Sequence, residues 1–92
     1  MLRFDWDAEK DRSNEAKHGV AFSEAATAFG DPLSITVPDP DHSVGEARFL
    51  LVGLTYLGRL VVVSHVETKE SISIISARLA SRRERKIYEE EA

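Results

Sequence analysis

The sequence predicts an α+β domain with two N-terminal helices, an antiparallel three- to four-stranded sheet and a C-terminal helix. Helix-forming residues with capping signals occupy the first third of the chain. Apolar runs separated by turn residues follow them, and a charged helical segment ends the chain. The 92 residues suffice for one small domain, residues 1–92, with its helices against one face of the sheet.

The first predicted helix covers residues 8–18 and follows a short predicted strand at residues 2–6. Asp7 is a suitable N-cap, and Gly19 supplies the left-handed position that often ends a helix. Acidic residues come early in this segment and basic residues late, which suits the helix dipole. Because few of its residues are apolar, we expect this helix to lie largely on the surface.

A second helix is predicted at residues 24–29, with Ser23 as its N-cap and Gly30 and Pro32 closing it. Four apolar segments then have the composition of strands, and the second of them is apolar enough to be central. Leu57, Gly58 and Arg59 make a tight hairpin turn. The predicted strands are residues 33–37, 47–56, 60–67 and 72–77, and the predicted C-terminal helix is residues 78–92.

Charge is distributed unevenly along the chain. The net charge is −4, but residues 1–46 hold 4 Lys and Arg against 10 Asp and Glu, whereas residues 47–92 hold 8 against 6. The overall charge argues against a bulk nucleic-acid binder, whereas five basic residues within 78–86 form a local basic stripe. That stripe is either a solvated helix face or a site for a polyanion.

Other composition features exclude several classes of site. The chain has no cysteine, so it has neither a disulfide framework nor a thiolate metal site. The three histidines, His18, His42 and His65, have no metal-ligand spacing, and we predict no metal and no cofactor. No apolar run could span a membrane and the N-terminus lacks a signal-peptide core, so we expect a cytoplasmic protein without membrane contact.

Lys17 and His18 stand directly before Gly19 at the end of the first predicted helix. One interpretation is purely structural, because cations at a helix C-terminus ahead of a glycine are common and stabilising. The other is functional, because a partly exposed histidine at a helix end can titrate near neutrality. The residues themselves leave both interpretations open.

Two other groups of polar residues are candidates for chemistry. Glu46 and Arg48, two positions apart, would lie on the same face of a strand, either as a surface ion pair or as an acid–base group beside a phosphate binder. Arg78 is expected at a strand-to-helix junction, with Arg82 and then Arg85 or Lys86 on the same side of the helix. Tyr88 is expected to pack with its hydroxyl at the rim.

Taken in order, these segments resemble the BrnT family, small ribonuclease toxins of bacterial type II toxin–antitoxin pairs with a RelE-like fold. The resemblance rests on "FDWDAEKDRSNEAKHGVAFSEAATAFGDP", "PDPDHSVGEAR" and "IISARLASRRERKIYE" and runs through residues 3–89. One departure is Ser73, where the family often has an arginine. The polar positions that match the family are Asn14, Lys17, His18, Glu46, Arg48, Arg78, Glu84 and Tyr88.

The resemblance implies an endoribonuclease that cleaves RNA without a metal. It also implies a BrnA-like antitoxin partner with a ribbon–helix–helix part that binds operator DNA, so that toxin and antitoxin form a hetero-oligomer. DNA would be contacted only through the antitoxin.

RNA cleavage by 2′-hydroxyl attack needs a base, cations around the phosphorane and an acid for the leaving 5′-oxygen. We assign the base to Glu46 or His18, charge stabilisation to Lys17, Arg48 and Arg78, and the acid to Tyr88 or His18. The RNA backbone would be held by Arg82, Arg83, Arg85 and Lys86.

Two other functions fit the same residues. The chain could be a binding module without turnover, whose main role is to bind the antitoxin and modulate repression of its operon. It could also be an independent DNA-binding regulator, although no helix–turn–helix spacing with a basic recognition helix supports that idea. Growth arrest on expression alone separates a nuclease from a binding module.

Overall fold

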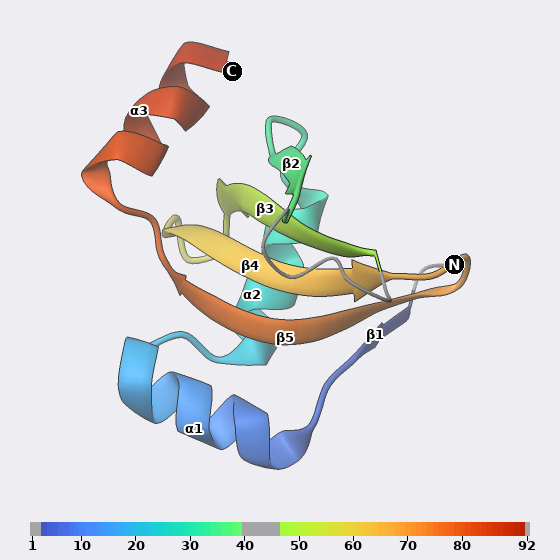
Figure 1. Cartoon of the computed structure of the whole chain (residues 1–92). Coiled ribbons are helices and arrows are strands. Elements are labelled where there is room, and N and C mark those ends of the chain that lie inside the picture. Colours follow the sequence, from blue (N-terminus) through green and yellow to red (C-terminus); the bar gives the residue numbers. More distant parts are fainter. Residues whose placement is uncertain (1–2, 40–46, 92) are drawn as a thin grey trace.

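Five strands form one mixed sheet in the order β1-β5-β4-β3-β2, with β4 at its centre (Figure 1). The structure is a computed structural model that describes residues 3–39 and 47–91. The elements are β1 (Arg3–Asp5), α1 (Ala8–His18), α2 (Phe22–Thr27), the 3-10 turn η1 (Ala28–Gly30), β2 (Ile35–Pro38), β3 (Arg48–Leu54), β4 (Leu60–Glu67), β5 (Ser71–Leu79) and α3 (Arg82–Glu91).

The sheet differs from the predicted antiparallel three- to four-stranded one because β1 joins it in parallel. Arg3 pairs with Ser71 and Asp5 with Ser73, at the start of β5. The other three strand pairs are antiparallel, as predicted. The sequence pattern did indicate the short strand at residues 2–6, but a parallel pairing across most of the chain has no local signal.

The second helix also departs from the prediction. It begins at Phe22 and has only six residues before the chain tightens into η1. Ser23 does not cap it, because the Phe22 amide donates instead to the Asp11 carboxylate of α1 at 2.9 Å. The cap is therefore supplied by a neighbouring helix, which fixes α1 against α2.

The predicted caps of α1 are confirmed. The Asp7 carboxylate accepts hydrogen bonds from the Glu9 and Lys10 amides at 2.8 and 3.0 Å, which satisfies two of the free amides at the helix start. Gly19 follows the helix with φ of 72°, and Gly58 turns the β3–β4 hairpin with φ of 77°. Both positive angles favour glycine, as the sequence indicated.

The helices lie on both faces of the sheet, not on one. Side chains of α2 and of the connection between α1 and α2 pack with alternate residues of β3, β4 and β5 on one face; this core includes Val20, Phe22, Ala25, Leu51, Val61, Val63, Ile72 and Ile74. The intervening strand residues, such as Leu50, Val52 and Val62, face α3 instead. α3 projects away from the rest of the molecule at the end of β5 (Figure 1).

The last helix begins later than predicted because β5 extends to Leu79. Ser81 and Glu84 form a reciprocal capping box, in which the Glu84 amide donates to the Ser81 hydroxyl and the Ser81 amide to the Glu84 carboxylate. Arg78 therefore lies in the strand. The expected ladder of Arg78, Arg82 and Arg85 or Lys86 along one helix face does not form.

The described helices are all too short or too polar to cross a membrane.

Candidate active site

Asn14 of α1 completes the outer edge of β5. Its side-chain amide donates to the Ala77 carbonyl at 2.8 Å and its oxygen accepts from the Ala77 amide at 3.1 Å. β1 covers only the first residues of β5, so the Asn14 side chain takes the place of a strand partner at Ala77. A third hydrogen bond, to the Val20 carbonyl at 2.9 Å, ties the end of α1 to the same point.

A second set of polar contacts fixes the end of α1. Arg59, in the β3–β4 hairpin, donates to both carboxylate oxygens of Glu24 and, at 2.9 Å, to the Gly19 carbonyl. The Thr55 hydroxyl also donates to the buried Glu24 carboxylate, at 2.8 Å. The Arg59 hydrogen bonds hold the pKa of Glu24 below its usual range, so this anchor stays charged at neutral pH.

Between α1 and the uncovered edge of β5 lies a polar hollow of about 230 Å³. A β-bulge shapes its strand wall, because the pairing of β4 with β5 shifts between Ser64 and His65 and leaves Ile75 as the extra residue. The lining residues are Lys10, Ser13, Asn14, Lys17 and His18 from α1 and Ile75 and Ser76 from β5. Lys17 and His18, which the sequence singled out, are thus exposed together beside two hydroxyl groups.

Arg78 lies two residues beyond Ser76 on the same strand, about 6.5 Å further along. Its guanidinium makes a bidentate pair with Glu84, with distances of 2.7 and 2.8 Å. Hydrogen bonds from Arg78, and then from Ser81, outweigh burial and lower the pKa of Glu84 to about 2. Glu84 thus fixes the Arg78 side chain at the start of α3.

Tyr88 sits on the inner side of α3 and its hydroxyl donates to the Asp31 carboxylate at 2.5 Å. The side chain is buried, and burial together with the negative charge of Asp31 raises the pKa of Tyr88 to about 12. Asp31 also accepts from the Leu33 and Leu54 amides, both at 2.9 Å. The structure thus gives Tyr88 an anchoring contact.

The four predicted RNA-binding cations are exposed on the first half of α3, and none forms an ion pair with another described residue; they are Arg82, Arg83, Arg85 and Lys86. Figure 1 places the start of α3 and the end of α1 at the same end of β5. The cations, Arg78 and the hollow therefore lie toward the same end of β5.

Arg48 lies elsewhere. It pairs with Val66 on β4, whereas Arg78 pairs with Val62, so the two arginines are four β4 positions apart, about 13 Å along the strand. Arg48 is partly buried. Glu46 and His42 lie outside the described residues.

The two described histidines, His18 and His65, lie in different surroundings. His65 is fully buried in the core, with its ring edge-to-face against Phe29 and stacked on Phe49. Its nitrogens lie 3.1 Å from the Val63 carbonyl and 2.9 Å from the Glu67 carboxylate. Within residues 3–39 and 47–91, no three acidic, His or Cys side chains gather as metal ligands.

Sequence reasoning missed Lys10, Ser13 and Ser76. A signal for Lys10 and Ser13 was present, because positions 10, 13, 14 and 17 lie on one face of a helix. Ser76 carried no signal, since a bulge in β5 brings it to the hollow. The start of α3 could also have been predicted, because "SRRE" at residues 81–84 has the spacing of a capping box.

Chemically, this edge suits a phosphodiester. The two lysines that line the hollow can balance phosphate charge, an imidazole can transfer a proton and serine hydroxyls can donate hydrogen bonds to phosphate oxygens.

Two comparisons with known proteins bear on the family and the fold of the chain. A family model described as the ribonuclease toxin BrnT of type II toxin–antitoxin systems matches residues 6–84. The crystal structure of the Brucella abortus ribonuclease toxin BrnT resembles the chain with a TM-score of 0.69 and 24% identity, covering 89% of this chain and 100% of that one. At this identity the structural match shows a shared fold. No curated protein matches the sequence.

Proposed function

The chain belongs to the BrnT family of ribonuclease toxins from type II toxin–antitoxin systems, and on that premise we propose that it is a metal-independent endoribonuclease. It would cleave RNA by attack of the 2′-hydroxyl on the adjacent phosphorus and so inhibit growth in the cytoplasm. A BrnA-like ribbon–helix–helix antitoxin would neutralise it in a hetero-oligomer and would make all contacts with operator DNA.

The observation that carries this proposal is the hollow between α1 and β5. Lys10, Lys17 and His18 converge there from three turns of one helix, with the hydroxyls of Ser13 and Ser76 beside them. A helix end held by Asn14, Gly19 and Arg59 keeps that arrangement rigid, which favours a preorganised anion site.

His18 is the proton-transfer group that the geometry favours. It lies in the hollow, whereas the Tyr88 hydroxyl is already donated to Asp31. Two assignments remain distinct: His18 accepts the 2′-proton, or Glu46 accepts it and His18 protonates the leaving 5′-oxygen. An RNA whose 5′-leaving oxygen is replaced by sulfur needs no acid, so a His18→Ala variant should cleave it at the wild-type rate if His18 is the acid and should stay slow if His18 is the base.

We assign some of the cations to the reacting phosphate and the others to phosphates elsewhere on the RNA. We assign Lys17 and Arg78 to the phosphorane charge, because Lys17 lines the hollow and Arg78 lies on β5 two residues beyond Ser76, which also lines it. Arg48, about 13 Å away along β4, would contact a phosphate further along the RNA. The cations of α3 would hold the backbone on the other side, so binding should weaken as salt is raised.

The test is cleavage of RNA by the purified protein in EDTA. We expect cleavage products that carry a 2′,3′-cyclic phosphate or its hydrolysis product. A Lys17→Ala, His18→Ala double variant should lose at least about a hundredfold in rate, the scale of one proton-transfer group. Lys69→Ala, an exposed lysine in the β4–β5 turn, is the matched control. Equal rates in the double variant and the control would refute the site.

A second candidate function, a binding module with little or no turnover, is favoured by one observation. Ser73 occupies the position of an arginine that the family often carries, and its hydroxyl donates to Asp5 at 2.6 Å. If that arginine holds phosphate, this chain binds RNA weakly. Expression without the antitoxin distinguishes the two functions, because a binding module leaves growth unchanged.

A further inference from the structure

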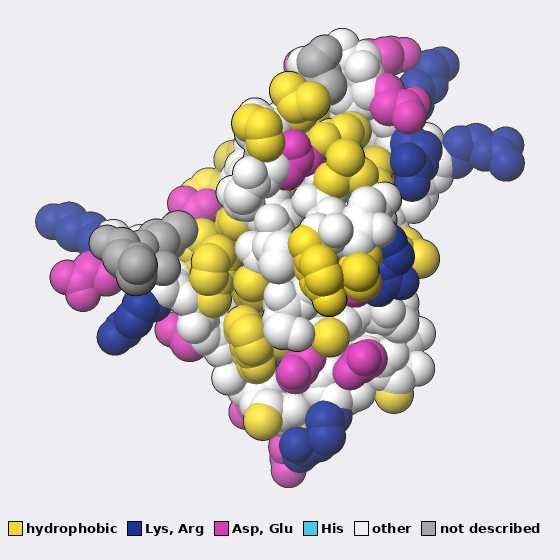
Figure 2. Space-filling model, turned by 180° about the vertical axis from the view of Figure 1, so that it is seen from behind, with side chains coloured by type: hydrophobic (Ala, Val, Ile, Leu, Met, Phe, Trp, Pro, Cys, Tyr) yellow, Lys and Arg dark blue, Asp and Glu magenta, His cyan; other side chains and the backbone are white. Residues whose placement is uncertain are grey.

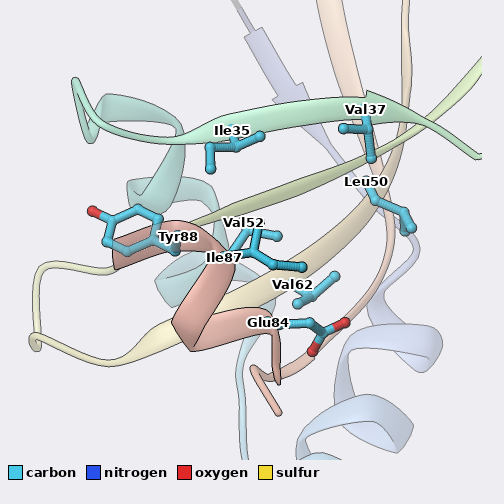
Figure 3. A pocket seen from close by; sticks show the side chains of 8 residues that line it. All are labelled: Ile35, Val37, Leu50, Val52, Val62, Glu84, Ile87 and Tyr88. Carbon is cyan, nitrogen blue, oxygen red and sulfur yellow. The ribbon is translucent and has the colours of Figure 1, made fainter. Parts of the chain in front are cut away.

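A groove of about 200 Å³ separates α3 from the sheet, and its walls are almost entirely apolar (Figure 3). The side chains of Ile87 and Tyr88 from α3 face those of Ile35 and Val37 from β2 across it. Leu50, Val52 and Val62 form its floor, and Glu84 is its one charged lining residue. Unfilled apolar walls of this kind lose the dispersion contacts that a packed core would have.

Polar contacts hold α3 over this groove at two places. Glu84 binds Arg78 and Ser81 near the start of the helix, and Tyr88 binds Asp31 one turn further on. Ile87 is left 48% exposed and Val37 45% exposed on opposite walls. The helix is thus positioned without its apolar side being covered.

The exposed apolar surface continues beyond the groove. Asp31 accepts hydrogen bonds from the Leu33 and Leu54 amides and so holds both residues near the Tyr88 end of the groove. The side chains of Leu33 and Leu54 are exposed. Figure 2 shows hydrophobic side chains extending from α3 across this side of the molecule. Continuous exposed apolar surface beside polar residues is typical of a protein interface.

The charge order along α3 points to what covers the groove. The basic residues lie in its first half, whereas Glu89, Glu90 and Glu91 end it. Helix dipoles favour the reverse order, with acidic residues near the start of a helix and basic residues near its end. The order is therefore unfavourable for the helix alone, and it complements a partner whose acidic residues meet the first half of α3 and whose basic residues meet its end.

We propose that the groove binds an amphipathic segment of the antitoxin. Its apolar side chains fill the space between α3 and β2, and its acidic residues lie against Arg83 and Arg85, which flank the groove side of α3. This inference rests on the proposed function for the identity of the partner. It adds the mode of inhibition: the segment covers Arg83 and Arg85, two of the four cations that hold RNA, so antitoxin and RNA compete for the first half of α3.

Other occupants fit these features less well. RNA offers a charged backbone to apolar walls, and its phosphates would be repelled by the acidic end of α3. A second copy of this chain could present the reversed charge order, but the one exposed apolar side chain on its α3 is Ile87, which already lines its own groove. Both occupants are outcomes of the test below.

The absence of cysteine allows a direct footprint. Val37→Cys and Ile87→Cys place single thiols on opposite groove walls, and Ser23→Cys, at an exposed position of α2, is the matched control. Each full-length variant is labelled with a maleimide, alone and in complex with the antitoxin co-purified from the neighbouring reading frame. We expect labelling of both groove thiols to slow at least about tenfold in the complex, as for interface side chains that lose contact with water, while the control is unchanged.

Three outcomes would overturn the proposal. The groove thiols could label equally fast in the complex, they could be protected by a single-stranded RNA oligonucleotide and not by the antitoxin, or their labelling could slow with toxin concentration alone. The second would assign the groove to RNA, and the third to a second copy of the chain.

A binding measurement separates this inference from the proposed function. Ile87→Asp should raise the Kd for the antitoxin at least about tenfold and leave RNA cleavage by the free toxin unchanged, because Ile87 is outside the hollow. Growth arrest by this variant should no longer be rescued by the antitoxin. If the chain cleaves no RNA but the groove thiols are protected, the proposed nuclease activity is refuted and antitoxin binding in the groove is supported. If the chain cleaves RNA and the thiols are not protected, the nuclease is supported and antitoxin binding in the groove is refuted.

Discussion

α1 and α3 border the same end of β5, but they are attached to the sheet by different means. α1 is fixed by a buried asparagine that bonds to strand backbone, and its neighbours α2 and β5 close a continuous apolar core. α3 is held by an exposed ion pair and a tyrosine–carboxylate bond over a groove that stays open. The difference separates a rigid wall, suited to hold reacting groups, from a helix suited to receive a partner.

The largest expected effect is on the rigid side. Asn14→Ala removes three hydrogen bonds and leaves the Ala77 amide and carbonyl without their partner at a buried edge. We expect the free energy of unfolding to fall by about 3 kcal/mol, measured by urea denaturation followed by circular dichroism. Ser13→Ala, its exposed neighbour, is the control; a loss equal to that control would mean that the asparagine does not fix α1.

A smaller loss of stability is expected when the hydrogen bond from Tyr88 of α3 to Asp31 is removed. Tyr88→Phe keeps the ring and removes the hydroxyl that donates to Asp31, which should cost about 1.5 kcal/mol. Because folding raises the pKa of Tyr88 from 10.0 to about 12, the hydroxyl's contribution is complete below pH 10 and disappears as the pH rises toward 12. The stability difference between wild type and variant, measured across this window, should shrink; a constant difference would contradict the assigned contact.

The contribution of Glu84, which pairs with Arg78 near the start of α3, should be lost in acid. Folding lowers the pKa of Glu84 from 4.5 to about 2, so its contribution is present above pH 4.5 and is lost as the pH falls toward 2. Solvent screening at the half-exposed Arg78 reduces that contribution to about 1 kcal/mol. Glu84→Gln should therefore be less stable than wild type at pH 7 and equally stable near pH 2, by thermal unfolding. A deficit that persists near pH 2 would show that the carboxylate charge is not its source.

The smallest effect is expected in the groove itself. Ile87→Ser replaces a half-exposed side chain that no partner covers in the free protein, so the free energy of unfolding should change by no more than about 0.5 kcal/mol. A loss comparable to that of Asn14→Ala would mean that the groove is part of the core, and the contrast between the two helices would fail.

Local chemistry made much of the fold predictable. The bounds of β4 agree with the alternating and apolar run at residues 60–67, and the Asp7 and Gly19 caps are set by residues within a few positions. What could not be predicted depends on pairs far apart in sequence: the parallel pairing of β1 with β5, and Asp11 as the cap of α2. A register shift in β5 and a polar helix that borders it have no signature in hydrophobic periodicity.

The residues that line the candidate site could be predicted only in part. Lys17 and His18 stood out because they sit at a helix end, and both line the hollow. Arg78 was found but misplaced, because its neighbours Arg82 and Arg83 made the whole segment look helical while Ser81 and Glu84 marked the true start. The role of Asn14 was hidden, since its partner Ala77 is 63 positions away.

The 63-residue separation between Asn14 and Ala77 has a consequence for folding during synthesis. A ribosome releases the chain from its N-terminus, so α1 emerges long before the strand whose edge it must meet. Until Ala77 has left the exit tunnel, Asn14 has no backbone to bind and the wall that carries Lys17 and His18 has no opposite side. For the proposed nuclease, a fragment that ends before Ala77 is therefore expected to be harmless to the cell that makes it.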